Sequence, residues 1–294
     1  MKRENDESAP TEALFNWFPG HMVKAIREIK QRLKMVDVVL EIRDARVPLA
    51  SGNAALDEAL GGKNKILIFN KANLCDPEMV KTWSKWFEQK GISHLFVNCF
   101  DKTALKKVIT IARKMADDNR RQSNPDMEAK TKLKMMIIGL PNTGKSTIIN
   151  QLANRNAVKV ADRPGLTQIQ QWITIDGDVE LLDTPGVMPP LVVDEEHALW
   201  LSAIHAIPDH IAGEEATACF VVKHLLEIKS KEFMERFKLT ETDISVEEAY
   251  QKIATLRGCI RQKGLPDMDR VSKLVLAEFR TGELGRTCFE LPPV

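Results

Sequence analysis

The sequence predicts an α/β fold, a mostly parallel sheet wrapped by helices, followed by a small all-α C-terminal domain. Short apolar runs alternate with helical stretches in the first part of the chain, which is the pattern of a parallel sheet. These runs occupy residues 36–42, 66–69, 94–98 and 133–138. From about residue 189 onward, longer helical stretches replace them, so we expect no further strands there.

Three further segments have their own local patterns. Apolar residues recur at helical spacing from Met22 to Leu33, after the letters FPGHM, and predict an amphipathic helix. The runs WITI, from residue 172, and VELL, from residue 179, flank an Asp-Gly-Asp turn and predict a hairpin at the sheet edge. We expect the polar residues 116–132 to form a surface connection.

Length and composition favour a globular protein of two domains. The chain has 294 residues, 44% of them hydrophobic and 28% charged, and no stretch approaches the roughly 18 apolar residues of a membrane span. We assign residues 1–14 to a disordered tail, 15–190 to the α/β domain and 191–294 to the helical domain. The five cysteines lack metal-ligand spacing, and the acidic start is neither a secretory signal nor a transit peptide, which predicts a cytoplasmic protein with reduced thiols.

The net charge of +1 is distributed unevenly. Residues 102–134 carry 10 Lys and Arg against 4 Asp and Glu, whereas residues 191–250 carry 5 against 13. Residues 251–294 carry 8 against 5. Two basic zones therefore flank an acidic one, and basic zones are where nucleic-acid contacts are expected.

The segment GLPNTGKST matches the phosphate-loop pattern of two glycines five apart followed by Lys-Ser. Its glycines allow backbone N–H groups to surround phosphate oxygens, and a helix that begins near Lys145 adds its positive dipole end. Lys145 is expected to reach the β and γ phosphates, and the Ser146 hydroxyl to bind Mg²⁺. The predicted nucleotide-binding residues of this loop are Gly139, Asn142, Thr143, Gly144, Lys145, Ser146 and Thr147.

A second motif, Asp-Thr-Pro-Gly at residues 183–186, ends the VELL strand. Alone it would be a turn, but some 40 residues after a phosphate loop it favours a metal and phosphate role. Asp183 would bind Mg²⁺, and the Gly186 N–H would face the γ-phosphate. Thr167 lies between the two motifs and would add its hydroxyl to the metal.

Asn70-Lys71-Ala72-Asn73 directly follows the strand at 66–69 and resembles the Asn-Lys-x-Asp motif with which GTPases recognise guanine. Asn98 and Cys99, at the end of the next strand, would support the base. In an ordinary GTPase these two motifs come last, whereas here they precede the phosphate loop. The chain therefore resembles a circularly permuted GTPase, which explains why 138 residues precede the loop.

A closer resemblance covers nearly the whole folded chain, from about Trp17 to the FRTGELGRTCFE stretch. FPGHM, DARVP, the permuted order, GLPNTGKS, DRPGLTQIQQW and LLDTPG together look like the YlqF/RbgA family of ribosome-assembly GTPases. The resemblance implies GTP hydrolysis with Mg²⁺, coupled to binding and release of a large-subunit precursor, with ribosomal RNA contacts from the helical domain. A monomer is the default for such a switch.

Two ion and partner assignments depend on this resemblance. Asn142 matches the residue that helps hold K⁺ in potassium-stimulated relatives, although a turn role is equally open. The RNA-contacting candidates are basic residues, which favour salt-sensitive binding to phosphate backbones over the alternative of a solvated helix face. They are Lys252, Arg257, Arg261, Lys263, Arg270 and Lys273.

The first departure from ordinary GTPases concerns the catalytic water. Val187 occupies the position of the usual water-orienting Gln and cannot hydrogen-bond to water. In this family the His of FPGHM is the proposed substitute, here His21; the alternative is that His21 only begins a helix. The catalytic candidates are therefore His21, Lys145 and Thr167.

The second departure is Asn73 where the guanine-binding motif has Asp. A carboxylate accepts hydrogen bonds from both guanine N1–H and the exocyclic amine, whereas an amide presents a donor to one of them. We therefore expect weakened GTP binding and improved binding of xanthosine triphosphate. Two alternatives stay open: a nucleotide-dependent binding module with vestigial hydrolysis, and a purine NTPase with altered base preference.

Overall fold

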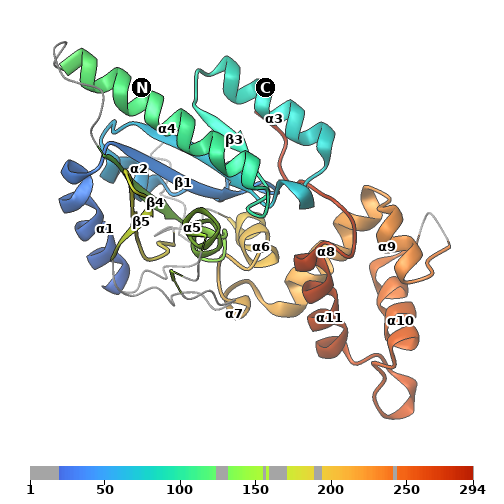
Figure 1. Cartoon of the computed structure of the whole chain (residues 1–294). Coiled ribbons are helices and arrows are strands. Elements are labelled where there is room, and N and C mark those ends of the chain that lie inside the picture. Colours follow the sequence, from blue (N-terminus) through green and yellow to red (C-terminus); the bar gives the residue numbers. More distant parts are fainter. Residues whose placement is uncertain are drawn as a thin grey trace, which may run out of the picture.

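The computed structural model of the chain describes residues 20–123, 132–154, 157–158, 171–188, 194–240 and 244–293 (Figure 1). The side chains of residues 20–22, 123 and 263 are not among those described. The predicted tail at residues 1–14 and the metal-ligand candidate Thr167 also lie outside the described residues.

The described residues contain one six-stranded sheet with the order β3-β2-β1-β4-β6-β5. Neighbouring strands are parallel except for β5 and β6, which pair antiparallel at one edge and confirm the predicted hairpin. The strands are β1 (Val38–Asp44), β2 (Lys65–Asn70), β3 (His94–Phe96), β4 (Leu133–Gly139), β5 (Gln171–Asp176) and β6 (Val179–Asp183).

The parallel register brings the strand ends with polar side chains to one edge of the sheet. Asp44 of β1 pairs with Asn70 of β2, Ile42 of β1 with Gly139 of β4, and Ile137 of β4 with Asp183 of β6. Three of the sequence motifs therefore meet at the carboxyl ends of adjacent strands, where ligands bind in open α/β sheets.

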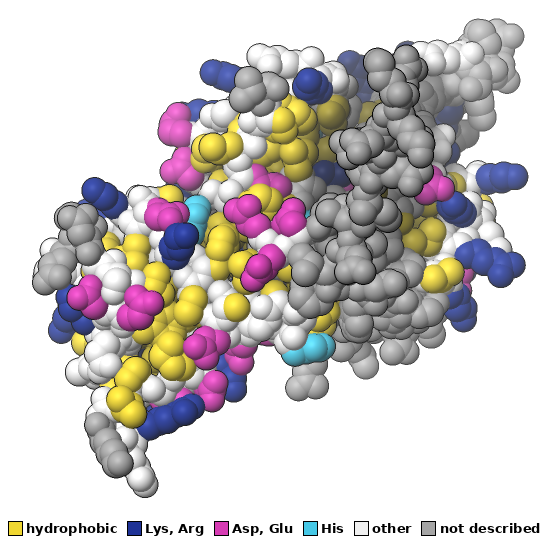
Figure 2. Space-filling model, turned by 180° about the vertical axis from the view of Figure 1, so that it is seen from behind, with side chains coloured by type: hydrophobic (Ala, Val, Ile, Leu, Met, Phe, Trp, Pro, Cys, Tyr) yellow, Lys and Arg dark blue, Asp and Glu magenta, His cyan; other side chains and the backbone are white. Residues whose placement is uncertain are grey.

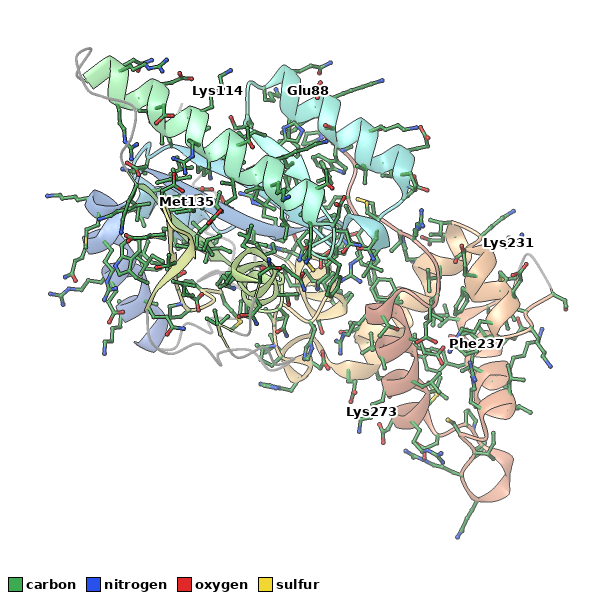
Figure 3. All side chains as sticks on the ribbon, in the orientation of Figure 1. Glu88, Lys114, Met135, Lys231, Phe237 and Lys273 are labelled. Carbon is green, nitrogen blue, oxygen red and sulfur yellow. The ribbon has the colours of Figure 1, made fainter. Side chains whose placement is uncertain are left out.

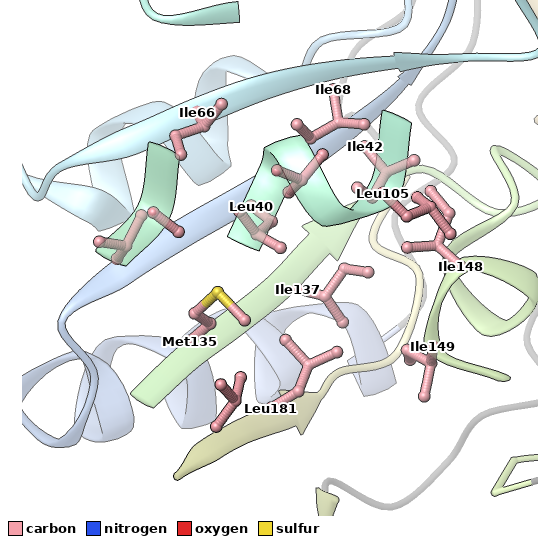
Figure 4. Close-up of a cluster of buried hydrophobic side chains, with 14 of the residues drawn as sticks. Leu40, Ile42, Ile66, Ile68, Leu105, Met135, Ile137, Ile148, Ile149 and Leu181 are labelled. Atoms are coloured by element: carbon pink, nitrogen blue, oxygen red, sulfur yellow. The ribbon is translucent and has the colours of Figure 1, made fainter. Parts of the chain in front are cut away.

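Helices cover both faces of the sheet. One face packs against α4 (Lys102–Ser123) and α5 (Lys145–Ala153), with Leu40, Ile42, Ile137 and Leu181 in the shared core (Figure 4). The other face packs against α1 (Gly20–Arg32), α2 (Ala54–Leu60) and α3 (Pro77–Gln89). Caps fix the starts of two of these helices, because the Asn53 and Asp76 side chains accept hydrogen bonds from the first backbone N–H groups.

The expectation of a surface connection at residues 116–132 was wrong for its first part. The α4 helix continues to Ser123, and Ala116 is only 1% exposed against the sheet. Leu105, Val108 and Ala112 precede it at helical spacing, so the polar residues after position 116 belong to the outer face of the same helix. Residues 124–131 lie outside the described part of the chain.

The C-terminal part is helical, as predicted. Its helices are α6 (Glu195–Ala203), α7 (Asp209–Ala212), α8 (Glu214–Glu227), α9 (Lys231–Arg236), α10 (Val246–Arg257) and α11 (Met268–Thr281). Val221, Phe237, Ile253 and Val275 belong to the core that α8 to α11 share. Within the described ranges, no helix combines the length and hydrophobicity required to cross a membrane.

Helix α6 belongs to two cores. Ala198 and Leu201 pack with the sheet and α1, whereas Ala203 packs with the C-terminal helices. The predicted domain boundary at residue 190 therefore precedes a helix that joins both parts of the molecule. That boundary stays a prediction.

The chain after α11 returns to the sheet and runs beside α3 (Figure 1). The Thr287 N–H donates to the Leu74 carbonyl at 3.0 Å, and the Glu290 carboxylate accepts from the N–H groups of Leu49 and Ala50 at 2.7 and 2.8 Å. The Trp83 indole N–H donates to the Glu290 carbonyl at 3.2 Å. The last residues of the chain therefore fasten the C-terminal helices to the sheet.

Candidate nucleotide-binding site

The phosphate loop connects β4 to α5, and two of its glycines have no room for a side chain. Gly139 has φ of 144°, and an added Cβ would lie 2.2 Å from the Ile42 carbonyl oxygen. Gly144 has φ of 95°, and an added Cβ would lie 2.1 Å from the Asn70 amide nitrogen. Both positions combine a left-handed backbone with a close neighbour, so glycine is required at each.

Lys145 begins α5 and is directed back over the loop. Its residue is only 6% exposed, and Nζ donates to the Leu140 carbonyl at 2.7 Å. Burial lowers the pKa of Lys145 to about 8, although the carboxylate of Asp183 acts in the opposite direction. A buried cation at a helix start is placed to bind an anion such as a phosphate.

This pKa predicts that nucleotide affinity falls as the pH rises through about 8. The protonated lysine binds phosphate, and at pH 9 about one tenth of a group with this pKa keeps its proton, so we expect about ten-fold weaker GDP binding than at pH 7. Calorimetric titrations of the wild type at pH 7, 8 and 9 measure the effect. Equal affinities at all three pH values would show that Lys145 stays charged throughout.

Asp183 ends β6 beside this lysine. It is 0% exposed, and neither carboxylate oxygen has a hydrogen-bond partner among the described residues. Burial raises the pKa of Asp183 to about 6, against the opposing effect of Lys145. A buried carboxylate with two unpartnered oxygens fits a divalent cation, and Mg²⁺ prefers oxygen ligands completed by phosphates. The structure therefore has a suitable ligand for the predicted metal.

Asn70 joins the base-binding motif to the phosphate loop. Its Nδ2 donates to the Thr143 carbonyl at 2.9 Å, and its Oδ1 accepts from the Cys99 N–H at 3.1 Å. One buried side chain thus connects three segments that are distant in sequence. Asn73 lies exposed in the short 3₁₀ helix that follows (Ala72–Leu74), and the Asn98 side chain accepts from the Phe100 N–H at 3.1 Å.

Lys71 forms a buried charge cluster with Asp44 and Arg46, which the sequence motifs did not predict. Its ammonium lies 3.1 Å from Asp44, and Asp44 also accepts two hydrogen bonds from the Arg46 guanidinium, each 2.9 Å long. Burial alone would raise the pKa of Asp44, but Arg46 and Lys71 hold it well below its ordinary value. The letters DARVP, which begin at the last residue of the buried strand β1, were the sequence signal for this cluster.

A pocket of about 500 Å³ lies beside these groups, although Asn70, Asn73, Asn98, Cys99 and Asp183 are not among the described residues that line it. Lys71 lines it from the base-binding motif, and Asn142 and the segment from Gly144 to Thr147 line it from the phosphate loop. His205 and Arg280, from the C-terminal part, also line it, and no sequence motif had indicated their involvement. The Asn142 amide donates to the His205 carbonyl at 2.8 Å.

The segment after β6 packs on the phosphate loop. An added Cβ at Gly186 would lie 3.1 Å from the Lys145 ammonium and 3.0 Å from the Pro141 backbone, which places this backbone beside the loop. Val187 is 0% exposed in the core, so its side chain faces no water. His21 is the second residue of α1, and its side chain lies outside the described atoms. Its catalytic role stays a prediction.

Three of the RNA-contacting candidates pair with acidic side chains. Arg257 lies 3.3 Å from Glu278, Arg261 lies 3.1 and 3.0 Å from Asp267 and Asp269, and Lys273 lies 3.9 Å from Glu214. Figure 3 shows Lys273 on the outer side of α11. Lys252 is half-buried in α10, Arg270 is exposed in α11, and the side chain of Lys263 is outside the described atoms.

These pairs reduce the positive charge that the C-terminal helices present. Acidic and basic side chains are interspersed over the part of this region seen in Figure 2, and no single-sign patch is visible there. An RNA phosphate would have to compete with the carboxylates, so the RNA contacts stay a prediction.

Comparisons with known proteins identify the family of this chain. A family model described as "50S ribosome-binding GTPase" matches residues 134–254. Ribosome biogenesis GTPase A from Bacillus pumilus is 37% identical over 276 residues, which cover 94% of this chain and 98% of that protein.

Two solved structures confirm the permuted α/β fold with its helical domain. A GNP-bound YlqF from T. maritima has a TM-score of 0.64 and 27% identity, covering 91% of this chain and 97% of that one. A GDP-bound TM YlqF has the same TM-score and identity over 90% of this chain and 99% of that one. On its identity to the curated relatives, this chain belongs to the Ribosome biogenesis GTPase A (YlqF/RbgA) family.

Proposed function

We propose that this protein binds GTP with Mg²⁺, hydrolyses it to GDP and phosphate, and acts in the cytoplasm as an assembly factor for the large ribosomal subunit. The observation that carries the proposal is the Asn70 side chain, which hydrogen-bonds to the phosphate loop at Thr143 and to the base-support segment at Cys99. Lys71 of the base-binding motif lines one pocket together with the phosphate-loop segment from Gly144 to Thr147, so a nucleotide whose phosphates bind the loop would lie beside the base-binding motif.

The roles of the residues follow from charge and position. Lys145 would neutralise the β and γ phosphates, and the Thr143, Gly144 and Thr147 backbone would surround them. Asp183, Ser146 and Thr167 would bind Mg²⁺, which when bound spreads the charge that develops on the phosphates. The buried side chain of Val187 leaves the positioning of water to another group, for which His21 is the candidate.

Nucleotide state would control ribosome binding through the segment after Asp183. In the permuted chain this segment leads directly to α6, and α6 packs against both the sheet and the C-terminal helices. A phosphate-dependent movement there would therefore reach the proposed helical domain over residues 191–294 directly. GTP favouring the bound state, and hydrolysis favouring release, is the direction that the family resemblance implies.

GTP turnover with and without purified large ribosomal subunits tests this function. We expect strong stimulation by the subunit in Mg²⁺ and K⁺, a decrease at higher salt as phosphate contacts are screened, and loss of the stimulation in His21→Ala. Equal rates in K⁺ and Na⁺ would remove the K⁺ role of Asn142. Turnover that ignores the subunit would contradict the ribosomal assignment while leaving the GTPase assignment intact.

A binding module with vestigial hydrolysis is the second candidate, and the complete burial of Val187 favours it. His21→Ala separates the two once calorimetry shows that the variant still binds GTP, because it removes the candidate water-positioning group and leaves the phosphate-binding residues in place. Under this second candidate, cells carrying His21→Ala would assemble large subunits normally. Accumulation of a large-subunit precursor in those cells would exclude it.

A further inference from the structure

We propose that helix α11 forms one wall of the nucleotide pocket, so that Ala277, Arg280 and Thr281 face the bound guanine nucleotide between its base and its terminal phosphate. The inference rests on the proposed function and adds a contact that none of the sequence motifs contains. These three residues line the same pocket as Lys71 and the segment from Gly144 to Thr147.

The three residues are arranged to face a ligand. Ala277 and Thr281 are one helical turn apart, and both are exposed, whereas Val275, Leu276 and Phe279 of the same helix are packed in the C-terminal core. Arg280 lines the pocket together with Lys71 and Lys145, and a carboxylate lies near each of these cations: Asp209 near Arg280, Asp44 near Lys71 and Asp183 near Lys145. Three cations around one cavity suit a polyphosphate.

Contacts to the end of α6 hold α11 at this place. The Arg280 guanidinium donates to the carbonyls of Ser202 and Ala203 at 2.8 and 3.2 Å, and pairs with Asp209. His205, in the turn that follows α6, accepts a hydrogen bond through its carbonyl from Asn142 of the phosphate loop at 2.8 Å. The loop and α11 are therefore both bound to one helix end.

Helix α11 also contacts residues that neighbour the base-binding motif. An added Cβ at Gly282, which ends the helix, would lie 2.5 Å from the Leu74 side chain, directly after the base-binding motif. On the buried side of the helix, the Phe279 ring lies 5.3 Å below the guanidinium of Arg46, the partner of Asp44. Segments next to the base-binding motif and the phosphate loop thus both connect to α11, so occupancy of the pocket would be coupled to the placement of this helix.

The test is to fill the pocket from this wall. Ala277→Phe should weaken the binding of both GDP and a non-hydrolysable GTP analogue by about ten-fold or more, because the added ring occupies space that the nucleotide needs. Ala216→Phe is the matched control, since Ala216 is an exposed alanine of α8 that does not line the pocket. The control should bind like the wild type, and both variants should unfold at the wild-type temperature.

Calorimetry on the full chain separates the possible failures. Wild-type protein that binds no guanine nucleotide in Mg²⁺ overturns the proposed function and this inference together. If the wild type binds guanine nucleotide and Ala277→Phe binds it with the same affinity, only the proposal that α11 lines the nucleotide site is overturned. Hydrogen exchange gives a second measurement without a mutation: GDP should slow the exchange of residues 268–281, and protection confined to the phosphate and base-binding segments would contradict the inference.

The charge of Arg280 has its own test. Arg280→Gln should weaken GDP binding because it removes the positive charge. Arg280→Lys should recover most of the lost affinity, because its ammonium restores the charge although it lacks the guanidinium that donates to two carbonyls of α6. Equal losses in the two variants would show that Arg280 serves only to hold α6 and does not act on the nucleotide.

Discussion

Asn73→Asp should increase the preference for GTP over xanthosine triphosphate by about two orders of magnitude. The carboxylate accepts hydrogen bonds from both guanine donors, whereas the amide presents a donor to one of them. A hydrogen bond to a charged group contributes about 1.5–3 kcal/mol. One additional hydrogen bond to guanine, together with removal of the mismatched amide donor, therefore gives a change of this size. Asn73 is exposed in the 3₁₀ helix after Lys71, so the substitution disturbs no packing.

Competition titrations against a fluorescent nucleotide measure this preference in the wild type and in Asn73→Asp. ATP serves as the control, because it carries the same triphosphate and lacks both guanine donors, and its affinity should stay unchanged. If the substitution leaves the ratio of GTP to xanthosine triphosphate unaltered, Asn73 makes no contact with the base. The altered-preference alternative would then be excluded.

Asp44→Ala should lower the free energy of unfolding by about 3–5 kcal/mol, the usual cost of leaving a buried charge without its partner. Asp44 is 0% exposed and compensates two cations, Arg46 at 1% exposure and Lys71. The Arg46 Nη1 atom already lacks a hydrogen-bond partner among the described residues, so little remains to hold the guanidinium. Guanine-nucleotide affinity should fall as well, because Lys71 loses the carboxylate that positions it.

Urea unfolding measures the first effect, and nucleotide titration of the folded variant measures the second. Asp57→Ala is the control, since the Asp57 side chain is 45% exposed and its ion pair with Lys65 should contribute about 1 kcal/mol or less. A loss for Asp44→Ala as small as that for Asp57→Ala would mean that the cluster is solvated in solution. Its role in positioning Lys71 would then be withdrawn.

Local patterns determined most of the fold. The strands, the edge hairpin and the helix after the phosphate loop follow from the spacing of apolar residues and from turn chemistry, both of which operate within about ten residues. The polar stretch after Ala116 was misassigned because an exposed helix face and a surface connection have similar composition, and only its packing on the sheet separates them.

The candidate site divides in the same way. The sequence by itself determined the phosphate loop, the base-binding motif and their permuted order, because each motif is a contiguous stretch whose chemistry requires particular residues. Only the tertiary structure decided that Asn70 bonds to Thr143, that Asp44 and Arg46 surround Lys71, and that Arg280 and His205 line the pocket. Arg280 is 78 residues away in the sequence from its partner Ser202, and Asn70 is 73 residues away from Thr143. Such contacts depend on how packed elements meet in space, which no local spacing in the chain encodes.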